Sequence, residues 1–215
     1  MNEAESRTMK LEQRHIDALI EAESWIFHSD ICPYLELKEL LLKNTQKSRE
    51  RFCVLFKRIY GMDKAGLTDT FLNRFFEILF DGKIYTESGL PDYSAILRRL
   101  YKFKRKQNDF ALQFSFVSKL VATHQDNCPF YDKHVRAFFG KKMPAKSEGI
   151  KKRIEWYVDF LNYVRRSYTE WEKNNRIKPL INRIRARDSR LMKCDTVRLM
   201  DYLVWNVGNK KLLKK

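Results

Sequence analysis

The chain has 215 residues, of which 44% are hydrophobic and 13% aromatic, and its 43 lysines and arginines against 27 aspartates and glutamates give a net charge of +16. This apolar content is enough for a folded core and excludes a disordered or collagen-like chain. Seven glycines and five prolines are too few for the many tight turns of a β-sandwich or barrel, so we expect an all-α fold.

Apolar residues at helical spacing predict ten helices along the chain. The clearest lies over 154–171, where one stripe is formed by residues at alternating spacings of three and four: Ile154, Tyr157, Leu161, Val164, Tyr168 and Trp171. Gly61, Gly82 and Gly140 follow apolar runs and are predicted to end helices. In chain order the predicted helices span 10–28, 34–43, 47–60, 69–80, 92–103, 109–124, 132–139, 154–171, 179–187 and 195–206.

No segment is convincing as a strand. Residues 83–86 are the best candidate, but they are few and lie between Gly82 and Gly89, so a turn explains them equally well. The most loop-like stretch is 140–149. We therefore expect a single helical domain, with possible lobes 1–139 and 150–215 joined by this loop and with the last long helices packed on the first.

The cysteines give no sign of a disulfide framework or a metal centre. All four lie far apart and form no CxxC pair, so we expect a reducing, cytoplasmic compartment. His124, Cys128 and His134 are close in sequence but lack a fourth ligand, and we expect neither a metal nor another cofactor. The N-terminus is charged, and no run approaches the ~18 apolar residues of a membrane span, which predicts neither export nor a transmembrane segment.

Positive charge is concentrated after residue 100. Residues 1–100 contain 15 basic and 16 acidic residues, whereas residues 101–215 contain 28 and 11, a net charge of +17. Counterion release makes such a surplus favourable for binding a polyanion, so we expect DNA as the partner and regard a membrane surface as the weaker alternative. The predicted nucleic-acid-binding residues form three clusters: Lys102, Lys104, Arg105 and Lys106; Lys141, Lys142, Lys146, Lys151, Lys152 and Arg153; and Arg183, Arg185 and Arg187.

The segment 110–140 contains one lysine in a run that is otherwise free of charge from Phe110 to Ala122. Apolar surroundings favour the neutral, nucleophilic form of a lysine amine, so Lys119 is a candidate nucleophile. The alternative is an ordinary amphipathic helix. Ser115, Ser118, Lys119 and Thr123 are spaced to form its polar stripe, and Lys119 would then be a solvent-facing residue.

Asp132 precedes the short apolar stretch that ends at Gly140 and is predicted to cap the helix over 132–139. A capping carboxylate lies at the positive end of the helix, so it stays ionised and held in one direction. These properties would also suit a catalytic carboxylate, although capping alone is a sufficient explanation for an aspartate at this position.

The sequence resembles a known family in this segment. Ser118-Lys119, His124 and then Pro129-Phe130-Tyr131-Asp132 resemble the active-site segment of the helix-hairpin-helix DNA glycosylases, especially the 8-oxoguanine glycosylase-like group. The resemblance implies a helix-hairpin-helix glycosylase-like fold, Lys119 as the nucleophile at C1′ of a flipped nucleotide and Asp132 as the carboxylate that stabilises the sugar cation. The Gly-x-Gly hairpin of the family is missing before Lys119, where Phe114 to Val117 contain no glycine.

Three functions fit these observations. The first is a DNA glycosylase, with or without lyase activity, that excises a damaged or modified base, and the second is a non-catalytic nucleic-acid-binding module on a similar helical scaffold. The third is an interaction protein whose basic half docks an acidic partner. For the first function, the side chains predicted to form the base pocket are Phe130, Tyr131, His134 and Trp205.

Overall fold

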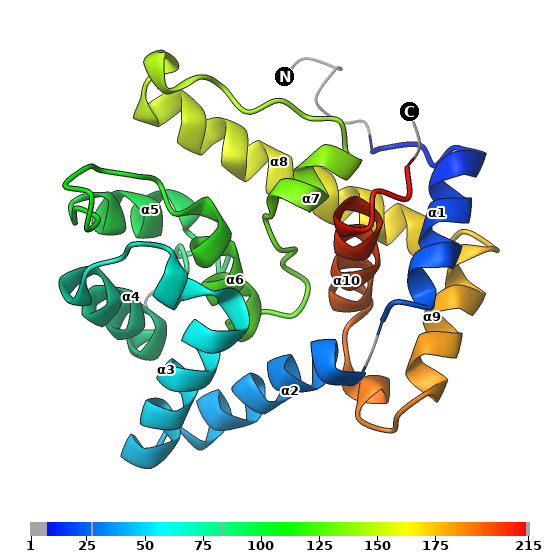
Figure 1. Ribbon diagram of the computed structural model, residues 1–215, viewed down its shortest axis with the longest axis horizontal. Coiled ribbons are helices and arrows are strands. Elements are labelled where there is room, and N and C mark those ends of the chain that lie inside the picture. Colours follow the sequence, from blue (N-terminus) through cyan, green and yellow to red (C-terminus); the bar gives the residue numbers. More distant parts are fainter. Residues whose placement is uncertain (1–7, 27, 83, 214–215) are drawn as a thin grey trace. The chain divides into compact units, whose positions relative to one another are not determined.

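The computed structural model describes residues 8–26, 28–82 and 84–213, and in this part of the chain it confirms the all-α fold (Figure 1). The only β-type pairing described is an isolated bridge between Tyr85 and Pro91, and Lys83 of the candidate strand lies outside the described residues. No described helix combines the length and the apolar character needed to cross a membrane. The helices are α1 (Gln13–Glu23), α2 (His28–Lys43), α3 (Gln46–Tyr60), α4 (Asp69–Asp81), α5 (Tyr93–Tyr101), α6 (Phe114–His124), α7 (Lys133–Phe138), α8 (Ile150–Glu172), α9 (Ile177–Ala186) and α10 (Thr196–Asn209).

The prediction of one helix over 10–28 was wrong, because α1 ends at Glu23 and α2 begins at His28. A distant residue accounts for the break. The Arg187 guanidinium donates hydrogen bonds to the carbonyl oxygens of Glu23 at 2.9 Å and Ile26 at 3.1 Å, and these bonds fix the turn after α1. The following helix then runs through Pro33, the residue after which it was predicted to begin.

The predicted helix over 109–124 begins five residues late, at Phe114. Asp109 is instead part of a turn, in which the Arg105 side chain donates hydrogen bonds to both of its carboxylate oxygens.

The predicted helix-ending glycines Gly61, Gly82 and Gly140 all have the left-handed backbone, with φ between 61° and 65°, which glycine adopts without a steric penalty.

The chain divides into two compact units, at positions other than the predicted ones. A terminal unit is formed by Met1–Cys32 and Gln125–Lys215, and a middle unit is formed by Pro33–His124. The predicted linker 140–149 lies inside the terminal unit, so it does not separate two lobes. The terminal unit has 26 basic and 17 acidic residues and the middle unit 17 and 10, so both carry a net positive charge.

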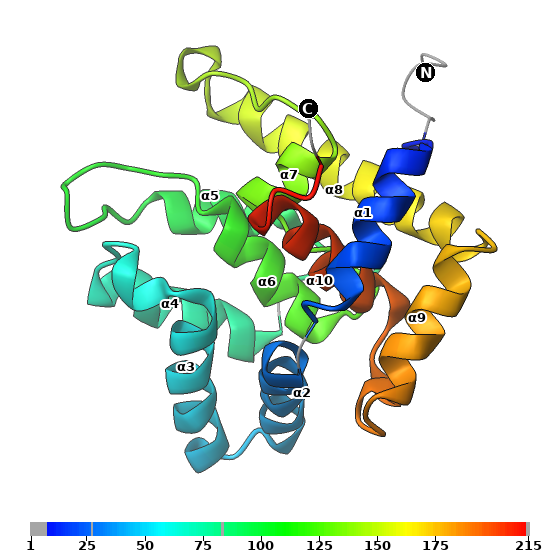
Figure 2. The ribbon, with the colours of Figure 1, turned by 45° about the vertical axis from the view of Figure 1, so that its right-hand side comes forward.

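Helix α10 is the centre of the terminal unit, where it contacts α1, α7, α8 and α9 (Figure 2). Ten of its 14 residues are buried, and most of these are apolar, as expected for a helix at the centre of a unit. The six residues of the stripe predicted on α8 are all at least 97% buried, which confirms that prediction. Packing of the first and last helices is also confirmed, since α1 contacts both α9 and α10.

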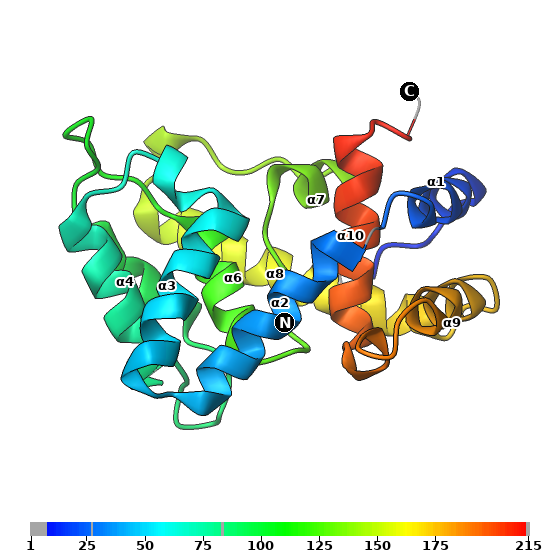
Figure 3. The same cartoon turned by 60° about the horizontal axis from the view of Figure 1, so that its bottom comes forward.

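The middle unit has a core of phenylalanines. Phe52 and Phe56 of α3 meet Phe75 and Phe76 of α4, with ring centroids between 5.5 and 6.5 Å apart, and the two helices lie side by side (Figure 3). Each of the four rings is at least 92% buried. Such aromatic contacts stabilise beyond the burial of area alone, so this unit has a core of its own.

Candidate nucleic-acid interface

Lys119 is held within the middle unit. Its Nζ donates a hydrogen bond of 2.7 Å to Ser115 Oγ one turn earlier and lies 5.2 Å from the centroid of the Tyr60 ring. The side chain is half-buried, whereas Ser118 and Thr123 are fully buried and donate to backbone carbonyl oxygens of α6. The polar stripe of α6 therefore turns partly into the core, and the amine of Lys119 has a fixed position.

Asp132 caps α7 as predicted, with its Oδ1 accepting a hydrogen bond of 2.9 Å from the backbone N–H of His134. The residue belongs to the terminal unit, whereas Lys119 belongs to the middle unit. Neither compact unit thus contains both members of the predicted catalytic pair.

Phe130 and Tyr131 are core residues, and each is 8% exposed. The Arg198 guanidinium carbon lies 3.6 Å from the centroid of the Phe130 ring, so it covers one face of that ring. Tyr131 contacts the rings of Tyr157 and Phe160 on α8 at 5.3 and 5.8 Å. Both predicted pocket residues are thus occupied by packing inside the terminal unit.

His134 and Trp205 are more open, since both are half-buried. Their rings meet edge to face with centroids 5.8 Å apart, which joins α7 to α10. The two helices approach closely here. A Cβ added to Gly208 would lie 2.7 Å from the Cβ of His134 and 2.9 Å from its carbonyl oxygen, which is closer than side chains pack.

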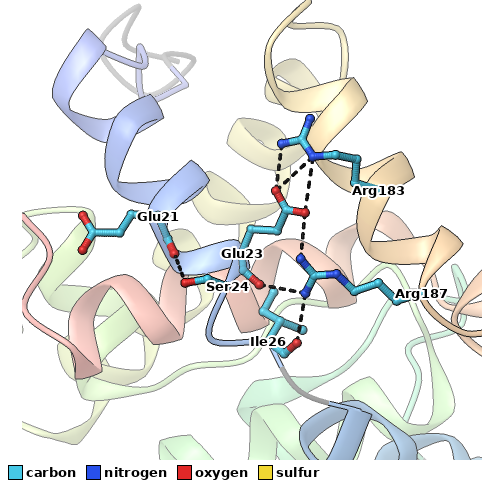
Figure 4. A network of polar contacts seen from close by, with 6 residues as sticks. All are labelled: Glu21, Glu23, Ser24, Ile26, Arg183 and Arg187. Carbon is cyan, nitrogen blue, oxygen red and sulfur yellow. Dashed lines mark hydrogen bonds and ion pairs between the residues drawn. The ribbon is translucent and has the colours of Figure 1, made fainter.

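The three arginines of the C-terminal cluster are used by the fold. Figure 4 shows Arg183 and Arg187 converging on the Glu23 carboxylate, with Nη2 to oxygen distances of 2.8 Å from both. Arg185 donates to Thr196 Oγ1 at 2.9 Å. These contacts bind α9 to α1 and to the start of α10, so all three arginines have partners within the unit, although Arg183 and Arg187 are exposed.

Residues 102–106 form a basic stretch in the middle unit, at the end of α5. Lys104 donates to Asn108 Oδ1 at 2.9 Å, and Arg105 pairs with Asp109. Lys102 and Lys106 are exposed, and neither side chain has an ion pair within the described residues. This stretch consequently offers fewer available charges than its sequence suggests.

A lysine surface lies on the terminal unit, over the loop before α8 and the first turn of that helix. Lys141 Nζ is 4.6 Å from the centroid of the half-buried Tyr163 ring. Lys142 and Lys146 are exposed, and their side chains make no ion pair with any described residue. We define the lysine surface as Lys141, Lys142, Lys146, Lys151 and Lys152.

The other two members of the lysine surface have partners that are easily exchanged. Lys151 lies 3.9 Å from Glu155, and Lys152 pairs with Glu148, with all four side chains at least 35% exposed. Exposed pairs of this kind contribute only about 0–1 kcal/mol, so a phosphate can replace the carboxylate at little cost. Arg153, predicted with them, is half-buried, and its Nη2 lies 3.9 Å from Met143 Sδ.

The sequence analysis did not predict an ion pair that is fully buried in the described part of the chain. Arg198 and Asp201 on α10 are 0% and 1% exposed and pair at 2.6 Å. Arg198 also donates to the Cys128 carbonyl at 3.0 Å, and the Phe130 N–H donates to Asp201 Oδ2 at 2.9 Å. Burial, together with the Asp201 carboxylate, raises the pKa of Tyr168 well above its usual value. Two charges three residues apart in an apolar helix were the available signal.

Among the described residues, no three or more His, Cys, Asp or Glu side chains are grouped in a way that could hold a metal ion. His124 lies in the middle unit, where its Nε2 is 2.8 Å from the Leu79 carbonyl oxygen, while Cys128 and His134 lie in the terminal unit.

Comparison of the chain with protein-family models, with curated proteins and with solved structures gave no match.

Proposed function

We propose that the protein binds duplex DNA through the lysine surface of the terminal unit. The observation that carries this proposal is the exposure of Lys142 and Lys146, which have no carboxylate partner among the described residues. Each phosphate that a lysine neutralises releases condensed counterions, and this release supplies most of the free energy of non-specific DNA binding. The net charge of +16 adds long-range attraction.

Lysine side chains support binding without sequence preference. The ammonium group is a mobile point charge that contacts phosphates and does not read base edges in a fixed geometry. Arginine side chains suit bidentate contacts to guanine. Arg183 and Arg187, however, are bound to the Glu23 carboxylate. We therefore expect similar affinities for unrelated duplex sequences at equal salt.

A salt titration by fluorescence anisotropy tests this proposal. The double variant Lys142→Gln/Lys146→Gln should reduce the slope of log K against log salt by about 1.8, which is about 0.9 for each lost phosphate contact. The matched control is Lys173→Gln/Lys178→Gln, which removes the same charge from exposed positions of the same unit and should leave the slope near that of the wild type. Equal slopes for the two double variants, or tighter binding to an RNA duplex of the same sequence, would refute the proposal.

A second candidate function is DNA glycosylase activity with a lyase step, and the restrained amine of Lys119 favours it. A nucleophile held by Ser115 and Tyr60 loses less freedom on reaching its transition state than a mobile surface lysine does. In this candidate the Lys119 nitrogen displaces the base at C1′, the base leaves with a proton, and the imine formed with the opened sugar permits β-elimination. The part of Asp132 in the reaction stays a prediction from the resemblance.

Borohydride trapping on oligonucleotides that carry modified bases or an abasic site separates the two candidates. The glycosylase candidate requires a covalent adduct that Lys119→Gln does not form and that the control Lys133→Gln, exposed on α7, still forms. Asp132→Asn keeps the helix cap and removes the charge, so it should fold normally and lose activity. Wild-type protein that binds DNA, gives no adduct and releases no base leaves binding as its function.

A further inference from the structure

The middle unit has an open pocket of about 530 Å³ that none of the preceding functions uses. It lies between α4 and the C-terminal end of α5, two helices that are in contact (Figure 1). One wall is a single face of α4 that includes Asn73, Arg74 and Glu77, and the other wall includes Arg99, Lys102 and Phe103. The volume falls within the range of about 300–1,000 Å³ that is typical of small-molecule sites.

The pocket carries an excess of positive charge. Arg74 Nη1 pairs with Glu77 at 2.9 Å, so the charges of these two residues cancel. The net positive charge of the lining then comes from Arg99 and Lys102. The side chains of Arg99 and Lys102 make no ion pair or hydrogen bond with any described residue, although Arg99 is half-buried. A half-buried guanidinium with several donors available is suited to binding an anion, and its planar donors match phosphate geometry.

The remaining lining adds groups that would recognise an aromatic ligand. Phe103 presents a half-buried ring next to Lys102, and the exposed Asn73 amide can donate and accept hydrogen bonds. An aromatic side chain next to a phosphate-binding cation is the combination that binds a nucleotide, because the base stacks on the ring while the cation holds the phosphate.

We propose that this pocket binds the phosphate of a nucleotide through Arg99 and Lys102, with the base stacked on Phe103. The ligand is either a free nucleotide or the phosphorylated end of a DNA strand, which present the same chemical groups. This proposal does not depend on DNA binding by the lysine surface, which belongs to the other unit.

Isothermal titration of the full-length protein with dAMP, deoxyadenosine and inorganic phosphate tests the proposal. The protein should bind dAMP at least about fivefold more tightly than inorganic phosphate, because of stacking, and should bind deoxyadenosine far more weakly than dAMP. Arg99→Gln and Lys102→Gln should each weaken dAMP binding by about tenfold, the effect of losing a charge-assisted hydrogen bond.

Arg98→Gln is the matched control, because Arg98 occupies the same last turn of α5 and does not line the pocket. Both arginines interact favourably with the helix dipole, but Arg98 is exposed whereas Arg99 is half-buried, so a second variant is needed to separate the pocket from packing. Thermal melting checks that each variant is folded, and the exposed Lys102 gives a variant that does not depend on the packing of Arg99. The Lys142→Gln/Lys146→Gln variant should bind dAMP as the wild type does.

The source of the nucleotide is distinguished with 5′-phosphorylated and 5′-hydroxyl forms of one short single strand, measured in the Lys142→Gln/Lys146→Gln background. A preference for the phosphorylated strand that Arg99→Gln abolishes identifies a strand end, and binding of dAMP alone identifies a free nucleotide. Both results support the pocket. Equal dAMP affinities for Arg99→Gln and Arg98→Gln, or equal affinities for dAMP and inorganic phosphate, would overturn the proposal.

Discussion

Arg183 and Arg187, in and directly after α9, carry the same kind of charge as the lysines of the lysine surface, but the terminal unit uses them differently. Arg183 and Arg187 share the Glu23 carboxylate, and Arg187 also donates to the backbone carbonyls of Glu23, at the end of α1, and of Ile26. Lys142 and Lys146 extend from a loop that has no carboxylate in contact with them among the described residues. The first group holds helices together, and the second group remains available to a partner.

The difference shows that a count of basic residues overstates a binding surface. Positive side chains that have already exchanged water for a carboxylate must lose that contact before they bind phosphate, and the buried partner would then be left without its counter-charge. The Glu23 side chain is only 11% exposed, so this cost is substantial for Arg183 and Arg187. Available charge, and not total charge, is therefore the basis on which we place the proposed DNA interface.

The largest expected effect comes from the basic residue that the fold uses most completely. Asp201→Asn removes the carboxylate charge that pairs with the fully buried Arg198 guanidinium at 2.6 Å. An uncompensated buried cation costs about 3–5 kcal/mol of unfolding free energy, which we expect urea unfolding to detect.

An exposed pair in the same unit is the control. Asp17→Asn removes the partner of Arg176, whose Nη2 lies 3.2 Å from the carboxylate while both side chains are at least 45% exposed. The unfolding free energy should change by less than about 1 kcal/mol. If both substitutions reduce stability equally, burial does not determine the contribution of the Arg198–Asp201 pair.

A smaller loss is expected at the shared carboxylate. Glu23→Gln should reduce the unfolding free energy by about 1–2 kcal/mol, because the lost charge-assisted bonds are stronger than neutral ones but the arginines are partly solvated. Glu21→Gln is the matched control, since its side chain points away from this network in Figure 4. No difference between the two variants in thermal unfolding would show that the Glu23 carboxylate does not contribute to holding α9 against α1.

The smallest effect is a pH dependence from basic groups that burial keeps neutral. Burial lowers the pKa of His124 below its usual value of 6.5, an effect that the hydrogen bond with Leu79 only partly offsets. The unfolded chain then binds the proton more readily, so stability is complete above pH 6.5 and declines as the pH falls below it. Replacing His124 with Gln should make the decline in unfolding free energy between pH 7 and pH 5 smaller. The decline that remains should come from His15, whose pKa is also lowered by burial.

The sequence predicted those parts of the structure that depend on local spacing. The stripe on α8 repeats with the helical period, and Asp132 precedes an apolar run, so both were found from residues a few positions apart. The end of α1 was not predictable in this way, because it depends on Arg187, which is 164 residues from Glu23. The division into units was missed for the same reason, since the terminal unit joins both ends of the chain.

The candidate sites followed the same rule. Charge clustering identified the lysine surface, but it assigned Arg183 and Arg187 to the same role because their acidic partner is remote in sequence. The pocket between α4 and α5 requires two helix faces to meet, and single-sequence periodicity does not pair helices. Lys119 and Asp132 are 13 positions apart yet belong to different units.

The most direct test of the distinction between committed and available charge compares two double variants in one experiment. Lys142→Gln/Lys146→Gln and Arg183→Gln/Arg187→Gln each remove two positive charges, and both are measured for thermal stability and for the salt dependence of DNA binding. We expect the lysine variant to keep the wild-type melting temperature and to lose about 1.8 from the salt slope. The arginine variant should melt lower and keep the wild-type slope under conditions in which it is folded. The reverse pattern, or equal loss of slope in both variants, would contradict the assignment of DNA binding to the lysine surface.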